Sequence, residues 1–233
     1  NGHTTSFQYD VNDRLVEKTD ALGERSLRVY DAVGNVLSET DENGNQTTSE
    51  YDANYRLVQT TNALGGRRAF TYDDVGNLLV RIDEHQQSTV FEYDANDREV
   101  RSVDPLDGEQ ISVYDAVGNL ISQTDVNGNQ TTQEFDANDR LIRTTDPLGG
   151  QWDRAYDAVG NVVSKTDANR NETTFGFDAT NRRVRMIDPL SGEQTFTYDG
   201  VGNVVSEVNA NGHQTTFQYD ALERRVQSTD ALG

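Results

Sequence analysis

The stretch YDAVGNLISQTDVNGNQTTQEFDANDRLIRTTDPLGGQWDRA, residues 114–155, recurs in variant form along the whole chain. Its first six residues return unchanged at 30–35 and 156–161, as YDDVGN at 72–77 and as YDGVGN at 198–203. These copies are always separated by a multiple of 42 residues. A fixed period of this size indicates a repeat architecture in which each repeat is one supersecondary unit.

An aromatic residue followed by Asp recurs every 21 residues, with no insertion anywhere in the chain. We therefore expect one continuous array over residues 1–233, and a fragment of a longer chain, because the pattern is interrupted at both ends. The eleven pairs begin at Tyr9, Tyr30, Tyr51, Tyr72, Tyr93, Tyr114, Phe135, Tyr156, Phe177, Tyr198 and Tyr219.

Two kinds of repeat alternate, and they differ at the fifth position after the aromatic residue. This position is Asn in first-type repeats, such as 114–134, and Arg in second-type repeats, such as 135–155. The strict alternation predicts that neighbouring repeats occupy two non-equivalent environments. The Asn positions are Asn35, Asn77, Asn119, Asn161 and Asn203, and the Arg positions are Arg14, Arg56, Arg98, Arg140, Arg182 and Arg224.

Each repeat carries two turn signals. The first follows the aromatic residue, where first-type repeats have Gly, as at Gly118, and second-type repeats mainly have Asp or Asn, as at Asp139. Both residue types tolerate a positive φ. The second signal falls about ten residues later and is Asn-Gly in first-type repeats, a strong hairpin signal. Second-type repeats have DPLGG or DALGE there, and Pro105, Pro147 and Pro189 share this phase.

Runs of about six residues lie between the turns, which is the usual length of a strand. The run before the aromatic residue alternates, so that Thr89, Phe91 and Tyr93 share one face and Glu92 lies on the other. The run after the turn alternates less regularly, which predicts a β-bulge there. It always has an aliphatic residue seven positions past the aromatic: Val16, Leu37, Val58, Leu79, Val100, Ile121, Ile142, Val163, Val184, Val205 and Val226.

The expected fold is all-β, a repeat array of antiparallel β-hairpins with one hairpin per 21 residues and a 42-residue double repeat. Eleven such hairpins give about 22 strands. Because a single hairpin is marginally stable, we expect stacked hairpins to bury the aromatic and aliphatic face of each against the next. The natural twist of sheets predicts that the array winds into a spiral or solenoid.

Composition excludes several functional classes. The net charge of −20 disfavours a nucleic acid partner, because the phosphate backbone would be repelled. The chain has no Cys, so disulfides, thiolate metal sites and cysteine nucleophiles are absent. No apolar run approaches the roughly 18 residues that a membrane-spanning helix needs.

The stretch YDAVGNLISQTDVNGNQTTQEFDANDRL, residues 114–141, closely resembles the RHS/YD-repeat family. That family includes bacterial Rhs proteins, insecticidal toxin-complex shells and teneurins, and the resemblance covers the whole chain. It implies a long β-hairpin ribbon that spirals into a hollow shell. In bacterial members the shell encloses a toxic C-terminal domain, and in teneurins a similar shell serves cell adhesion.

Two features depart from the shell-forming members of that family. Those members cut off the enclosed toxin at a specialised segment around a DPxG motif, but here DPLG at 146–149 lies within an ordinary repeat. Related Asp-Pro turns recur at 104–105 and 188–189, so no protease residue is carried over. The repeats are also unusually uniform, which favours an extended tube or fibre over a closed shell.

The Asp after each aromatic residue is expected to accept hydrogen bonds from nearby backbone N–H groups as an Asx-turn, with the Arg of the same or the next repeat as a further partner. A glycosidase needs two unique carboxyl groups, and a residue present in every repeat is not unique. DENGNQ at 41–46 and DVNGNQ at 125–130 resemble the start of a calcium loop, but Gly stands at position four, not six. A hairpin turn is favoured there, with weak Ca²⁺ binding as the alternative.

The remaining candidates for chemistry are few. His3, His85 and His213 are too sparse for a catalytic array, and the serines of one repeat phase, such as Ser38, lack a His partner. Trp152 is the only tryptophan, and packing in a strand is favoured over a sugar-stacking site.

These observations predict a non-catalytic structural segment of an extracellular or cell-surface β-spiral of a bacterium, forming a filament, a tube or a shell wall. The alternatives are part of an RHS-type shell around a C-terminal toxin, and an adhesion or glycan-binding module. We expect no catalytic residue, cofactor or metal, and as partners the neighbouring repeats, other copies of the chain, and an enclosed toxin or a surface glycan. The expected structural signature is Tyr30, Asp31, Gly34, Asn35, Leu37, Tyr51, Asp52, Arg56, Val58, Tyr114, Asp115, Gly118, Asn119, Ile121, Phe135, Asp136, Arg140 and Ile142.

Overall fold

The computed structural model describes residues 4–232, which form 22 strands of one antiparallel sheet and no helix. No described segment could therefore cross a membrane as a helix. The expected all-β hairpin array and its strand number are confirmed. The strands are β1 (Ser6–Tyr9), β2 (Leu15–Thr19), β3 (Arg25–Tyr30), β4 (Val36–Thr40), β5 (Gln46–Tyr51), β6 (Leu57–Thr61), β7 (Arg67–Tyr72), β8 (Leu78–Ile82), β9 (Ser88–Tyr93), β10 (Glu99–Val103), β11 (Glu109–Tyr114), β12 (Leu120–Thr124), β13 (Gln130–Phe135), β14 (Leu141–Thr145), β15 (Gln151–Tyr156), β16 (Val162–Thr166), β17 (Glu172–Phe177), β18 (Arg183–Ile187), β19 (Glu193–Tyr198), β20 (Val204–Val208), β21 (Gln214–Tyr219) and β22 (Arg225–Thr229).

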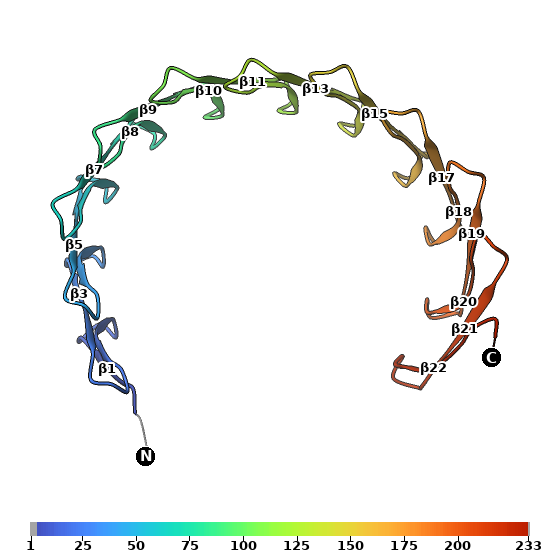
Figure 1. Ribbon diagram of the computed structural model, residues 1–233, viewed down its shortest axis with the longest axis horizontal. Coiled ribbons are helices and arrows are strands. Elements are labelled where there is room, and N and C mark those ends of the chain that lie inside the picture. The colour runs from blue at the N-terminus through green and yellow to red at the C-terminus, as the bar shows by residue number, and fades with distance from the viewer. Residues whose placement is uncertain (1–3, 233) are drawn as a thin grey trace. The chain divides into compact units, whose positions relative to one another are not determined.

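The chain divides into two compact units, one made of residues up to Ser112 together with Thr124–Gly128, the other of Val113–Gln123 together with the residues from Asn129 onward. Within each unit, consecutive strands lie side by side in chain order, and the turns alternate between the two edges of the ribbon (Figure 1). Each interior strand is therefore paired on both sides, with its own hairpin partner and with a strand of the adjacent hairpin.

The hairpin closed by the first turn contains a bulge at a fixed place. In the pair β3–β4, Tyr30 faces Val36 and Val29 faces Ser38, so Leu37 is the extra residue on its strand. Val58 and Ile142 occupy the same place in β5–β6 and β13–β14. The bulge predicted from the irregular alternation is confirmed, and its extra residue is the invariant aliphatic position. Ile121 of the signature lies in β12.

Turns at both edges have the same five-residue form, a type I turn followed by one residue with positive φ. In the turn at Asp41, the Asp41 N–H donates to the Asn45 carbonyl and the Gly44 N–H donates to the Asp41 carbonyl, at 3.0 Å each. Gly44 has a φ of 80°, and no positive φ occurs at Asn43. The Asn-Gly pair therefore does not form a two-residue type I′ turn, which needs a positive φ at both residues.

The alternation of Gly with Asp after the aromatic residue has a backbone cause. Gly34, Gly118 and their first-type equivalents have φ between 100° and 109°, a region open only to glycine. The second-type position, as at Asp139 with a φ of 58°, lies in the left-handed region that Asp and Asn tolerate. The two repeat types thus differ in turn backbone as well as in side chains.

The sheet has an aromatic face and a polar face, which the register defines. The aromatic face carries the aromatic residue that precedes each first-turn Asp and the aliphatic residues at the bulge. It also carries the residue two positions before the aromatic one, as Phe91 precedes Tyr93. The polar face carries mainly Thr, Ser, Gln and paired charges. No side chain in residues 4–232 is fully buried. The expectation that stacked hairpins bury one face against the next is therefore wrong: hairpins join edge to edge through backbone pairing, which leaves both faces of the sheet half exposed.

The turn glycine offers a matched test of backbone strain. We expect Gly202→Ala to lower stability by about 1 to 2 kcal/mol, because an alanine at a positive φ is strained. Gly200 lies in the same turn without a positive φ, and a Cβ there meets nothing within 4 Å. Gly200→Ala should leave the thermal unfolding midpoint nearly unchanged. Equal midpoints for the two variants, measured by circular dichroism, would refute the assigned turn geometry.

Candidate functional site

The carboxylate of the Asp after each aromatic residue organises the first turn. One oxygen of Asp31 accepts hydrogen bonds from the backbone N–H groups of Val33, Gly34 and Asn35 at 3.0, 2.7 and 2.8 Å. Its other oxygen accepts from the Asn35 side-chain amide at 2.8 Å. The predicted Asx-turn role is thus observed, and it satisfies the backbone donors that a tight turn leaves without partners.

An equivalent residue opens the turn at the opposite edge, a role that the sequence interpretation missed. The Asp41 carboxylate accepts from the N–H groups of Asn43 and Asn45 and from the Asn45 amide. The sequence does carry a signal for this role: an Asp or Asn stands ten residues after each Asp that follows an aromatic residue. The residues in this role are Asp20, Asp41, Asn62, Asp83, Asp104, Asp125, Asp146, Asp167, Asp188, Asn209 and Asp230.

The second-type Arg joins its own turn to the next repeat. Arg140 donates from Nε to Asp136 at 2.7 Å and from a terminal nitrogen to the Asp157 backbone carbonyl of the next repeat at 3.1 Å. Its guanidinium carbon lies 4.6 Å from the centre of the Tyr156 ring. We call this three-way contact the arginine clamp, and it also occurs at Arg14, Arg56 and Arg182.

The first-type Asn makes a different link at the equivalent place. The Asn119 amide donates to Asp115 of its own turn at 2.9 Å and to the Asp139 side chain of the next repeat at 3.1 Å. Asn77 makes the same link to Asp97. Arginine clamps at Arg14, Arg56, Arg140 and Arg182 and asparagine links at Asn77, Asn119 and Asn161 therefore lie in repeats of different type along one edge of the ribbon, which gives the two repeat types different environments.

The tyrosine hydroxyls reach back to the preceding repeat. Tyr30 donates to the Leu15 carbonyl at 3.0 Å and Tyr51 donates to the Val36 carbonyl at 3.1 Å. The acceptor is the first strand residue after the preceding first turn, beside the bulge. Phe135 and Phe177 keep the ring at this position but have no hydroxyl to donate. The same hydrogen bond occurs at Tyr72, Tyr156, Tyr198 and Tyr219.

Many of the signature residues take part in these contacts, for example Asp31, Asn35 and Arg140. The aromatic residue, the Asp and the Asn or Arg form the inter-repeat links, whereas Leu37, Val58 and Ile142 are bulge residues. The predicted Arg–Asp partnership holds within a repeat, as for Arg56 with Asp52 at 2.7 Å. Toward the next repeat, Arg56 contacts a backbone carbonyl and a tyrosine ring instead of a carboxylate.

Hydrogen bonds lower the pKa of the first-turn carboxylates. The side-chain hydrogen bond from Arg140 lowers the pKa of Asp136, and the side-chain hydrogen bond from Asn161 lowers the pKa of Asp157. A general acid or base needs a pKa near the working pH, and a lowered carboxyl pKa moves away from neutrality. In the structure both carboxylates accept backbone hydrogen bonds that close their turns.

These lowered pKa values predict acid lability. A carboxyl whose pKa is lower in the folded state than in the unfolded chain contributes stability above its ordinary pKa, and this stability is lost as the pH falls through the folded value. We expect the thermal midpoint to fall between about pH 4 and about pH 2, below the ordinary pKa of Asp. A midpoint that stays constant over that range, measured by circular dichroism with light scattering as an aggregation control, would contradict this role.

The serines of the repeat phase considered from sequence include three with hydrogen-bond partners. Ser164 donates to Glu172, and the Ser122 and Ser206 hydroxyls accept from glutamine side chains. His85 and His213 lie exposed in turns, and His3 lies outside the described residues. Within residues 4–232, no group of three or more His, Asp or Glu side chains is arranged to hold a metal ion.

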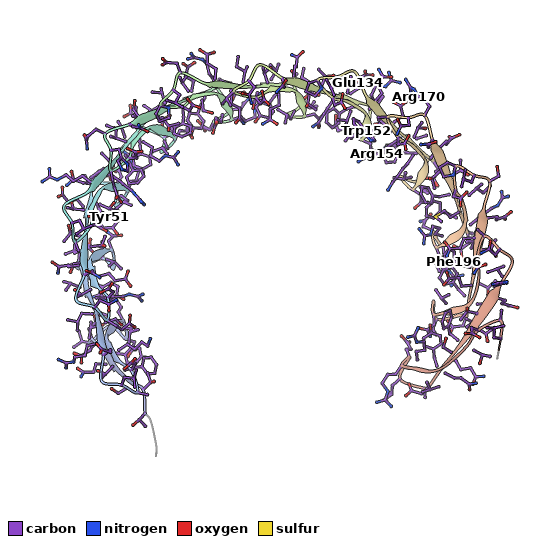
Figure 2. All side chains as sticks on the ribbon, in the orientation of Figure 1. Tyr51, Glu134, Trp152, Arg154, Arg170 and Phe196 are labelled. Atoms are coloured by element: carbon purple, nitrogen blue, oxygen red, sulfur yellow. The ribbon has the colours of Figure 1, made fainter. Side chains whose placement is uncertain are left out.

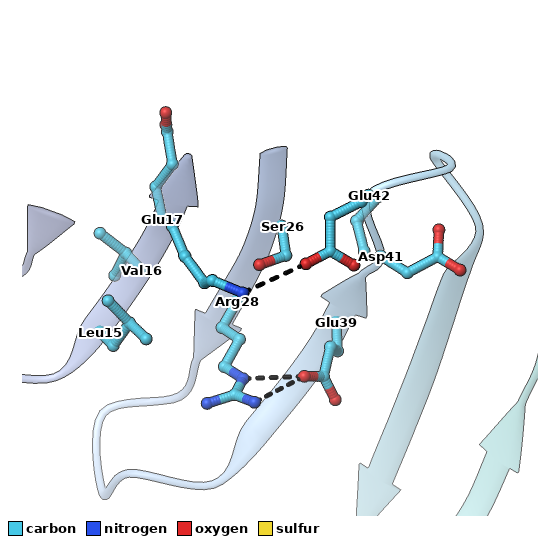
Figure 3. Close-up of a pocket in the computed structure, with 10 residues that line it drawn as sticks. Leu15, Val16, Glu17, Ser26, Arg28, Glu39, Asp41 and Glu42 are labelled. Atoms are coloured by element: carbon cyan, nitrogen blue, oxygen red, sulfur yellow. Dashed lines mark hydrogen bonds and ion pairs between the residues drawn. The ribbon is translucent and has the colours of Figure 1, made fainter. Parts of the chain in front are cut away.

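The hollows on the sheet surface are shallow. One of about 250 Å³ lies over β2, β3 and β4 and is lined by Arg28, Glu39 and Glu42, among others (Figure 3). Arg28 donates twice to Glu39, at 2.9 and 2.7 Å, and Lys18 contacts Glu42 at 3.4 Å. The cations Lys18 and Arg28 in this hollow pair with carboxylates of β4 and of the turn that follows it.

Sequence-family comparison matches the RHS repeat model to residues 1–25, 30–67, 72–109, 114–151, 156–193 and 198–233. The internal matches begin at each first-type aromatic residue, so the family period equals the 42-residue double repeat. The chain belongs to the RHS repeat family. No curated protein matches the chain.

Solved structures with this RHS fold are large. The crystal structure of TcdB2-TccC3-TEV has a TM-score of 0.64 and 18% identity, and the match covers 96% of this chain and 14% of that chain. TcdB2-TccC3 without its hypervariable C-terminal region has a TM-score of 0.56 and 20% identity, with 97% and 15% covered. The chain therefore spans a small part of the length of the structures that it matches.

Proposed function

We propose that this RHS chain is a non-catalytic structural segment, one continuous array that forms part of the wall of a longer β-spiral. The observation that carries the proposal is the alternation of arginine clamps and asparagine links. Turn side chains of one repeat contact the next repeat, as Arg140 contacts the Asp157 backbone carbonyl and the Tyr156 ring. Repeats that contact mainly their neighbours form an extended array, which is the organisation expected of a wall.

The absence of catalysis is supported by the state of the carboxylates. The oxygens of Asp31 and Asp136 accept backbone and side-chain hydrogen bonds of their own turns, which leaves them bound within the fold. Every such residue is also repeated, whereas an active site requires a unique arrangement. The wall is accordingly formed by the structural signature residues.

We further propose that the protein acts outside a bacterial cell or on its surface. A chain without Cys has no thiol to oxidise in an oxidising environment, and the acidic surface favours solubility. Its partners are the neighbouring repeats of the same chain and, at the wall, other copies of the chain.

A second candidate, a closed shell around a toxic C-terminal domain, is favoured by the likeness to TcdB2-TccC3 over 96% of this chain. It predicts the same wall with a closed curvature and an enclosed cargo. The uniform repeats favour the open form, a tube or a filament.

Negative-stain electron microscopy of the full-length natural protein tests both forms. Long thin fibres of constant width would support the filament, and hollow closed particles would support the shell. A compact, solid globule would overturn the wall proposal in either form.

A further inference from the structure

The tips of the turns carry exposed aliphatic side chains in two rows, one at the edge with the first turns and one at the opposite edge. At the opposite edge, the third residue of every second-type turn is a leucine that is between 80% and 96% exposed. At the first-turn edge, the third residue of every first-type turn is a valine that is between 59% and 73% exposed. The leucine edge carries Leu22, Leu64, Leu106, Leu148, Leu190 and Leu232, and the valine edge carries Val33, Val75, Val117, Val159 and Val201.

The turns themselves do not require aliphatic residues at this position. Turns favour Gly, Pro, Asn, Asp and Ser, and the third position is Asn in most of the other turns, as at Asn43, Asn96 and Asn127. The backbone contact is the same in both cases, since the N–H groups of Asn43 and Leu64 each donate to the side chain that opens the turn, at 2.9 and 3.0 Å. A single exposed aliphatic residue is ordinary, but its return in every double repeat indicates an interaction surface.

The leucine tips and the valine tips lie at the two ends of the same strands. Strand β7 follows the turn of Leu64 and leads into the turn of Val75, and β3, β11, β15 and β19 are flanked in the same way. The tips of one row therefore recur every fourth strand, about 19 Å apart along the sheet. Strand side chains stand on the two faces of the ribbon instead, as Glu134 and Trp152 do on opposite sides (Figure 2).

This arrangement makes the two edges complementary to each other. In a second ribbon of the same sequence, placed alongside and displaced along the strand direction, each valine tip meets a leucine tip after the same shift of about 4.8 Å, one strand spacing. The tips that carry Asn then meet one another, since β5 is flanked by the turns of Asn43 and Asn54. A partner of another kind would have to reproduce the 42-residue period that both rows share.

We propose that the leucine edge of one copy of the chain docks on the valine edge of a second copy. The contact presupposes the proposed wall function and names the surface by which copies meet in the wall. One pair of tips covers little area, but a pair recurs with every double repeat, so that contacts accumulate along the two ribbons. Because unlike edges join, each added copy leaves one leucine edge and one valine edge free for the next.

Charge opposes this contact and gives it a signature. Each copy carries a net charge of −20, so that two copies repel one another at low ionic strength. Salt screens this repulsion, whereas the aliphatic tips have no charge to screen. Self-association of the chain, measured by sedimentation velocity over a range of protein concentrations, should therefore strengthen between about 0.05 M and about 1 M NaCl.

Two multiple variants remove one edge each. The leucine-edge variant combines Leu64→Asn, Leu106→Asn, Leu148→Asn and Leu190→Asn, and the valine-edge variant combines Val75→Asn, Val117→Asn, Val159→Asn and Val201→Asn. Each should weaken self-association by at least about tenfold, because apolar burial is lost at four tips. The thermal midpoint of each should stay close to that of the wild type, because Asn occupies this position in most other turns.

Mixing the two variants tests which edges join. One intact leucine edge and one intact valine edge remain between them, so an equimolar mixture should form a one-to-one complex and nothing larger. The matched control combines Val29→Thr, Val90→Thr and Val113→Thr, which remove exposed methyl groups from strands instead of turn tips. This control should associate like the wild type.

Four results would overturn the proposal. They are a wild-type chain that stays monomeric at every salt concentration, wild-type association by the leucine-edge variant, self-association of the valine-edge variant alone, and flotation of the wild type but not of the leucine-edge variant with zwitterionic phospholipid vesicles. The third result would mean that leucine edges pair with each other, and the fourth would assign the tips to a membrane. None of them removes a wall made of one chain, which microscopy tests independently.

Discussion

Asp136→Ala is expected to lower the thermal midpoint more than any other single substitution in its repeat. The Asp136 carboxylate accepts the Asn138 and Arg140 backbone N–H groups at 2.9 and 3.1 Å and holds the Arg140 guanidinium. Alanine leaves these turn donors without their acceptor and removes the anchor of the arginine clamp. Both the turn and the link to the next repeat are therefore lost together, which circular dichroism melting should register.

Two variants control this result. Asp136→Asn should retain most of the stability, because Asn62 fills the equivalent role at the opposite edge by accepting from Leu64 and Gly66. Glu134→Gln removes a charge whose contact with Arg143 is 3.7 Å long, and it should change the midpoint little. If Asp136→Ala melted like Glu134→Gln, the turn carboxylate would not organise the repeat.

Arg140→Ala is expected to have the next largest effect, through the neighbouring repeat. The lost stacking on Tyr156 and the lost hydrogen bond to the Asp157 carbonyl should together cost about 1 to 2 kcal/mol. For a chain of this size the midpoint should fall by roughly 2 to 8 °C. Arg140→Lys should recover only part of this, because an ammonium cannot contact Asp136, the carbonyl and the ring face together.

The matched control for the clamp is Arg143→Ala. Arg143 also pairs with a carboxylate, Asp153, at 2.6 Å, but on the polar face of the sheet and without a tyrosine ring beneath it. Its loss should cost about 0 to 1 kcal/mol, as for other exposed ion pairs. Equal destabilisation by Arg140→Ala and Arg143→Ala would mean that the clamp adds nothing beyond an ordinary surface ion pair.

Local structure could be predicted from the sequence because each feature has a local cause. A period-two pattern before Tyr93 indicates a strand, Gly118 indicates a backbone with positive φ, and the irregular run around Leu37 indicates the bulge. The Asn-Gly pairs misled only in detail: they mark hairpins, but the opening Asp41 closes a longer turn around Gly44.

The links between repeats were harder to predict because their partners are distant in sequence. An Arg and a Tyr stand sixteen residues apart in every double repeat, as Arg14 and Tyr30 do, and this spacing can be seen in the sequence. Only the structure shows that it places the guanidinium over the tyrosine ring. The tyrosine hydroxyl contacts a backbone carbonyl, which leaves no trace in the sequence.

The expectation of a buried face failed for a physical reason. Stacking two sheets face to face buries side chains, whereas adding a hairpin edge to edge satisfies backbone groups and covers side chains only partly. The single sheet leaves Tyr30 and Leu37 in intermediate or exposed positions, so their stabilisation comes from the repeats on either side.

Equilibrium unfolding of fragments with two, four, six and eight repeats, cut from residues 30–197, measures this dependence on neighbours most directly. The free energy of unfolding should be negligible for two repeats and should then rise by a similar increment with each added pair, as expected when nearest-neighbour interfaces dominate. A two-repeat fragment as stable as the eight-repeat fragment would contradict the claim that adjacent repeats hold one another in place.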